Sequence, residues 1–172
     1  DLTVDGSVCT GGAVCLMMML SGHNVLISML VATLAGMLTG LVTGLFHTFM
    51  GIPAILSGIL TQLGLYSINL KIMGKSNQAI NVDKYDLLVS LRYIKNVPFY
   101  KNTILVVAVV IILLVAILYW FFGTELGCAL RATGCNGNMA RAQGINTNFS
   151  KVLGLMISNG LVGLSGALLS QY

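Results

Sequence analysis

The sequence predicts an all-α fold, a polytopic bundle of membrane-spanning helices whose first span is partial or broken. Of the 172 residues, 56% are hydrophobic and only 8% are charged, whereas an ordinary soluble domain carries about 25% charged residues. The apolar residues form long blocks, several of which reach the roughly 20 residues that a helix needs to cross a bilayer. The nine Lys/Arg and five Asp/Glu residues, net +4, lie almost entirely between these blocks. This arrangement indicates charges that flank a membrane and argues against a nucleic-acid surface.

The first apolar block, residues 8–20, is too short to span a bilayer alone. Gly11 and Gly12 are expected to loosen a helix there. Irregular backbone at membrane depth is tolerated only where protein or a water-filled cavity covers it. The block is therefore a candidate lining for a transport path.

The second block, residues 25–46, repeats a small residue at every fourth position. These residues share one helix face, and small residues let the backbones of membrane helices approach closely. The pattern predicts a tightly packed neighbouring helix. Its members are Ala32, Gly36, Gly40 and Gly44.

Three further blocks are predicted to span the membrane, residues 51–70, 103–122 and 152–169. The first of them carries Pro53 within its first turn, where the missing N–H does little harm. It also carries the amides of Gln62 and Asn69, which need partners inside the bundle or a water-filled path. The last block holds a single buried-looking Asn159 among glycines.

A short helix is predicted between the last two blocks. Asn136 is a favourable N-cap, residues 137–143 allow about two turns, and Gly144 is a natural terminator. Because a helix this short is not stable alone, it must dock onto its own bundle or onto a partner protein.

The same segment resembles the cytoplasmic coupling loop of ATP-binding-cassette importer permeases of the ribose and branched-chain amino acid type. The resemblance rests on the spacing G-x4-A-x-G-x-N-x3-A-R-x2-G-I, followed by an apolar, Gly-rich helix. The matching residues are Gly127, Ala132, Gly134, Asn136, Ala140, Arg141, Gly144 and Ile145. The opening residues 1–7, Asp-Leu-Thr-Val-Asp-Gly-Ser, are similar to the stretch that opens the broken second helix of the family.

The resemblance implies a transport subunit of a bacterial inner membrane, which performs no covalent chemistry itself. It implies a second permease copy, separate ATPase subunits that bind the coupling helix and hold the ATP and magnesium, and an extracytoplasmic binding protein. The coupling residues it implies are Gly134, Asn136, Ala140, Arg141, Gly144 and Ile145. The substrate it implies is an amino acid, aromatic or branched-chain.

Candidate residues for the translocation path are Asp1, Asp5, Gln62 and Asn159. A carboxylate at membrane depth usually marks a functional path, but Asp1 and Asp5 at the surface would be ordinary acids of a helix N-terminus. Both interpretations stay open. No cofactor or metal is expected in this chain, because Cys9, Cys15, Cys128 and Cys135 lack metal-ligand spacing and are expected to be buried thiols.

The charges contradict the orientation that the resemblance implies. Residues 71–102 hold six Lys/Arg and residues 123–151 hold three, so the positive-inside rule places the first segment in the cytoplasm. The resemblance places the second one there. We follow the motif, because neither segment has a decisive charge excess.

Three other functions are compatible with parts of the sequence. An ion-coupled secondary transporter also uses broken helices and intramembrane amides, a sugar-importing permease shares the family resemblance, and a membrane scaffold needs only the small-residue face. The chain begins without an initiator Met and ends directly after an apolar block, so both ends are expected to continue in a longer protein.

Overall fold

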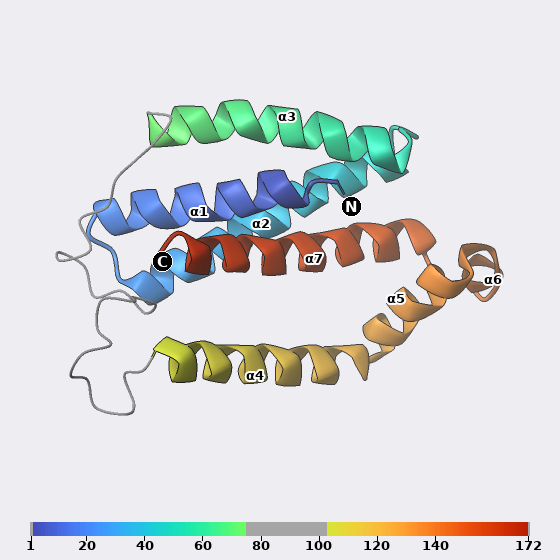
Figure 1. Cartoon of the computed structure of the whole chain (residues 1–172). Helices are drawn as coiled ribbons and strands as arrows, with labels where there is room; N and C mark the ends of the chain where they lie inside the picture. Colours follow the sequence, from blue (N-terminus) through green and yellow to red (C-terminus); the bar gives the residue numbers. More distant parts are fainter. Residues whose placement is uncertain (1, 75–102, 172) are drawn as a thin grey trace. The chain divides into compact units, whose positions relative to one another are not determined.

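The computed structural model describes residues 2–74 and 103–171, and the described residues form helices without a strand (Figure 1). They divide into two compact units, residues 1–87 with 152–172 and residues 88–151. The helices are α1 (Val4–Leu20), α2 (Val25–Thr48), α3 (Ala54–Met73), α4 (Thr103–Phe122), α5 (Glu125–Cys135), α6 (Gly137–Ala142) and α7 (Thr147–Leu169).

The first unit is held together by close backbone contacts between α7 and both α1 and α2. A Cβ atom built on Gly163 of α7 would lie 2.9 Å from the carbonyl oxygen of Ala32 and 3.0 Å from the Cα of Gly36. One turn further along α2, a Cβ on Gly40 would meet backbone atoms of Leu155, at 2.7 Å from its carbonyl carbon. The small-residue face of α2 therefore lies against α7, and there is no room between the two backbones for a side chain.

Helix α1 runs without interruption from Val4 to Leu20, so the predicted loosening at Gly11 and Gly12 is wrong. A Cβ on Gly11 would overlap the backbone of Gly163, and one on Gly12 would lie 3.4 Å from the carbonyl oxygen of Gly166. The contact with α7 compensates for the poor helix propensity of glycine, about 1 kcal/mol per residue. With 17 residues, α1 reaches only about 26 Å and falls short of a full span.

Three helices of the described residues, α2, α3 and α7, are long and apolar enough to cross a membrane. Residues Val107–Phe122 of α4 are long and apolar enough only when they are counted together with α5. The axes of α4 and α5 are bent by 81° at the break between them. They form a broken span or a re-entrant loop. The described residues therefore hold three or four spans and the shorter apolar helix α1, where four spans and one partial span were predicted. Helix α3 begins one residue after Pro53, which is its N-cap and not part of its first turn.

Candidate functional site

The predicted short helix is present as α6, and Asn136 holds it at its start. The Asn136 N–H donates to the carbonyl of Ala132, 3.0 Å away, and so ends α5. The Asn136 Oδ1 accepts the N–H groups of Asn138 and Met139 at 3.2 and 3.1 Å. One extended residue thus ends one helix and caps the next.

The end of α6 is closed by a glycine in the left-handed region. Gly144 has a φ of +85°, and its N–H donates to the carbonyl of Arg141 at 3.0 Å. The N–H of Ile145 donates to the carbonyl of Ala140 at 3.0 Å. This pair of bonds is a Schellman motif, which satisfies the last carbonyls of α6 and fixes the direction of the outgoing chain.

The next helix is tied to α6 by side chains. The guanidinium of Arg141 donates from Nη2 to the hydroxyl of Thr147 at 3.0 Å, and Thr147 is only 3% exposed. Asn146 Oδ1 accepts the N–H of Phe149 at 3.2 Å and caps the start of α7. The Arg141–Thr147 bond therefore connects α6 to the first turn of α7.

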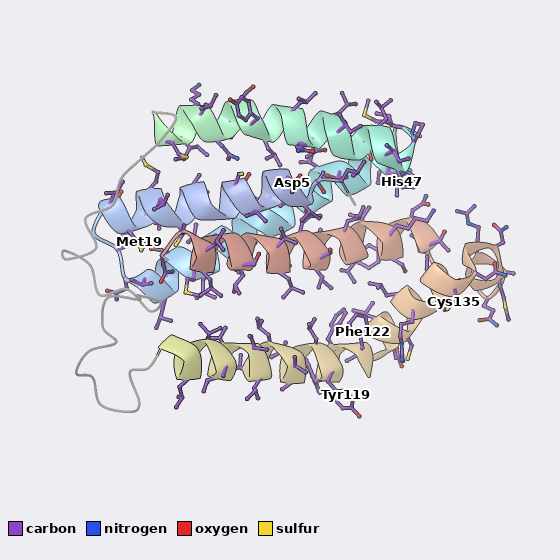
Figure 2. The ribbon with its side chains drawn as sticks, in the orientation of Figure 1. Asp5, Met19, His47, Tyr119, Phe122 and Cys135 are labelled. Atoms are coloured by element: carbon purple, nitrogen blue, oxygen red, sulfur yellow. The ribbon has the colours of Figure 1, made fainter. Side chains whose placement is uncertain are left out.

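The two central residues of α6 differ in exposure. Ala140 is buried, with 2% of its surface exposed, whereas Met139 is 60% exposed. Asn138, Arg141 and Gly134 are also exposed. A Cβ built on Gly134 would meet nothing within 4 Å. Cys135, the last residue of α5, is exposed as well (Figure 2). The surface that α5 and α6 offer to a partner therefore includes Met139 and excludes Ala140.

Replacing Asn136 with alanine is expected to destabilise α6 by about 0.5–2 kcal/mol, because two N–H groups lose their acceptor. Hydrogen exchange of the Asn138 and Met139 amides in the full-length protein measures this. Exchange should accelerate in Asn136→Ala and return towards the original rate in Asn136→Asp, which retains a capping oxygen. Asn148→Ala changes another exposed asparagine of the same unit and serves as the control. Unchanged exchange in Asn136→Ala would show that the cap does not hold the helix.

The first unit contains a buried polar cluster where α1, α2 and α7 meet. Asn159 is fully buried, and its Oδ1 accepts hydroxyl hydrogen bonds from Ser7 at 2.6 Å and Thr3 at 3.2 Å. Its Nδ2 donates to the carbonyl of Leu155 at 3.0 Å. The hydroxyls of Ser7 and Thr39 lie 2.8 Å apart. The cluster links three helices through side chains that are themselves buried.

The predicted path residues do not converge on one place. Asn159 belongs to α7 and bonds Ser7 of α1. Gln62 belongs to α3, and its Cα would lie 3.3 Å from a Cβ built on Gly6 of α1. Asp5 is exposed in the first turn of α1 (Figure 2), and Asp1 lies outside the described residues. The partners of Asn159 were missed because serine and threonine occur throughout these helices and nothing in their spacing distinguishes Thr3, Ser7 and Thr39.

Within residues 2–74 and 103–171, no three His, Cys, Asp or Glu side chains come close enough to share a metal ion. The cysteines differ from the prediction that all are buried. Cys15 is buried, but Cys9, Cys128 and Cys135 are exposed. All three exposed thiols belong to helices with apolar surfaces, so exposure here includes surface that lipid or a partner can cover.

Comparison with known proteins shows which family the sequence matches. Residues 1–172 match the family described as branched-chain amino acid transport system / permease component. The chain is 40% identical over 172 residues to a tyrosine transport system permease protein of Clostridioides difficile (strain R20291), covering 100% of this chain and 55% of that protein. It is 33% identical over 176 residues to an uncharacterized protein of Rickettsia prowazekii (strain Madrid E), covering 99% of this chain and 58% of that protein. The chain thus spans little more than half the length of these relatives, and no solved structure matches it.

Proposed function

Because the chain belongs to the family of branched-chain amino acid transport system permease components, we propose that it forms part of the membrane subunit of an ATP-driven amino-acid importer. It is a multi-pass protein of the cell membrane. The proposal assigns no covalent chemistry to this chain. ATP and magnesium would be bound by a separate ATPase subunit.

The observation that carries the proposal is the capped helix α6. It is held at both ends by hydrogen bonds, it presents Met139 outward, and Arg141 ties it to the first turn of α7. An exposed, capped helix of this kind would fit a groove on a cytoplasmic ATPase, and it would pass nucleotide-driven closure to the membrane helices as a rigid-body movement. The proposed coupling residues have different parts in this arrangement. They are Gly134, Asn136, Ala140, Arg141, Gly144 and Ile145. Asn136, Ala140, Gly144 and Ile145 shape the helix, Arg141 braces it, and the exposed Gly134 and Met139 are placed for contact with a partner.

The remaining subunits follow from the same proposal. A second permease copy would complete the path, and an extracytoplasmic binding protein would deliver the substrate. An aromatic amino acid is the substrate we favour, since one relative is named as a tyrosine transport permease. An ion-coupled transporter would leave the capped helix without a role, and a sugar-importing permease differs in substrate alone.

Uptake of labelled tyrosine tests the proposal in cells that lack their own tyrosine uptake and express the full-length protein with its ATPase and binding protein. Uptake should require ATP hydrolysis and persist when ion gradients are collapsed with ionophores while ATP is maintained. Labelled ribose and leucine are the substrate controls. Uptake that stops with the ion gradient and continues without the ATPase would overturn the proposal in favour of an ion-coupled transporter.

A further inference from the structure

The contact between α1 and α3 combines glycines and leucines with one hydrogen-bonded pair of polar side chains. A Cβ on Gly58 would lie 3.1 Å from Leu2, one on Gly6 would lie 3.3 Å from the Cα of Gln62, and Asn69 is bonded to Thr10. Because the paired residue numbers increase together, the two helices run parallel. We call this contact the α1–α3 seam. It is formed by residues 2–10, which lead into α1 and make up its first turns, and by residues 58–69 of α3.

Asn69 has an unpaired oxygen inside this seam. The side chain is 7% exposed, and its Nδ2 donates to the hydroxyl of Thr10 at 3.1 Å. That hydroxyl in turn donates to the carbonyl of Gly6 at 2.8 Å. Among the described residues, Asn69 Oδ1 is the buried side-chain polar atom that has no hydrogen-bond partner.

The unpaired oxygen belongs to a helix that is long enough to span a membrane. Asn69 is the sixteenth of the 20 residues of α3, so it lies in the last third of that helix. An unsatisfied buried acceptor costs about 1–3 kcal/mol. The nearest other amide of α3, that of Gln62, lies seven residues away, about 10 Å along the helix axis.

We infer that Asn69 Oδ1 accepts a hydrogen bond from a small N–H or O–H donor that enters the α1–α3 seam from an aqueous path, either water or the transported amino acid. The inference rests on the proposed transport function. Its structural basis is separate, because the unpaired acceptor and the Thr10 contact do not depend on α6.

Thiol accessibility tests the inference in the full-length protein in membranes, after replacement of its native cysteines. Asn69→Cys is compared with Leu63→Cys. Leu63 lies on the same helix, and this apolar residue is 64% exposed. A positively charged methanethiosulfonate reagent needs water and a thiolate, so we expect it to modify Asn69→Cys at least about tenfold faster than Leu63→Cys. Thr10→Cys, which replaces the hydroxyl and methyl groups by a thiol on the other side of the seam, gives a second reading if Asn69→Cys does not fold.

Two arms separate the sources of the donor. Protection of Asn69→Cys by excess tyrosine would assign the donor to the transported amino acid, and modification without protection would assign it to water. Modification of Asn69→Cys and Thr10→Cys as slow as that of Leu63→Cys would overturn the inference. The reaction needs no ATPase, so its failure is distinct from a failure of ATP-dependent uptake.

Discussion

Gly36→Ala is expected to destabilise the protein, while Gly64→Ala is expected to leave it unchanged or stabilise it. A Cβ on Gly36 would overlap the carbonyl oxygen of Asn159 and lie 3.1 Å from the Cα of Gly163. These are backbone atoms, so α2 and α7 would have to separate. A Cβ on Gly64 of α3 would meet nothing within 4 Å. The expected loss for Gly36→Ala is about 1–3 kcal/mol by overpacking, whereas alanine in place of an exposed helical glycine gains up to about 1 kcal/mol.

Thermal unfolding of the full-length protein in detergent measures both variants under the same conditions. Gly36→Ala should unfold at a lower temperature than the original protein, and Gly64→Ala at the same or a higher one. Equal unfolding temperatures for Gly36→Ala and the original protein would mean that α2 and α7 do not pack through their glycines.

The second large effect is expected at Met139. Its side chain is the large apolar group that α6 exposes, and a carboxylate there would have to be desolvated in the proposed groove of the ATPase. We expect Met139→Glu to weaken the complex by about 2 kcal/mol or more, roughly thirtyfold in Kd, which is typical of a central contact residue. Met139→Leu keeps an apolar side chain of similar volume and should bind nearly as well.

Co-purification of the full-length protein with its ATPase, followed by titration in detergent, gives the measurement. Asn148→Glu is the matched control, because it adds the same charge to an exposed residue of the same unit outside α6. If Met139→Glu bound the ATPase as tightly as Asn148→Glu, α6 would not be the contact. Bulky replacements at Ala140 would not answer this question, because Ala140 is buried and they would disturb α6 itself.

The helices could be predicted from the sequence where the signals are local. The bounds of α4 agree with the predicted block 103–122, because an uncharged apolar run ends at both sides with polar residues. The caps of α6 were also predictable, since Asn136 and Gly144 act on backbone groups a few residues away. Local signals were misleading at Gly11 and Gly12, where contact with α7 outweighs the intrinsic preference of glycine.

The buried polar cluster could not be predicted, because its bonds join residues that are far apart in the sequence. Thr3 and Asn159 are separated by 156 positions, and no periodicity along either helix specifies which faces meet. Asn159 was recognisable as an amide that needs a partner, but the identity of its partners depends on packing. The same holds for Ala140 and Met139, whose burial is decided by the way α6 folds against α5.

Photo-crosslinking from position 139 tests the central claim most directly. A photoreactive amino acid replaces Met139 in the full-length protein, which is expressed with its ATPase in intact cells, and position 63 in α3 serves as the control. A crosslink to the ATPase from position 139 and none from position 63 is the predicted result, and it would also place α6 in the cytoplasm, against the count of Lys and Arg residues. A protein that imports tyrosine in these cells and yet gives no crosslink to the ATPase from position 139 would contradict the account.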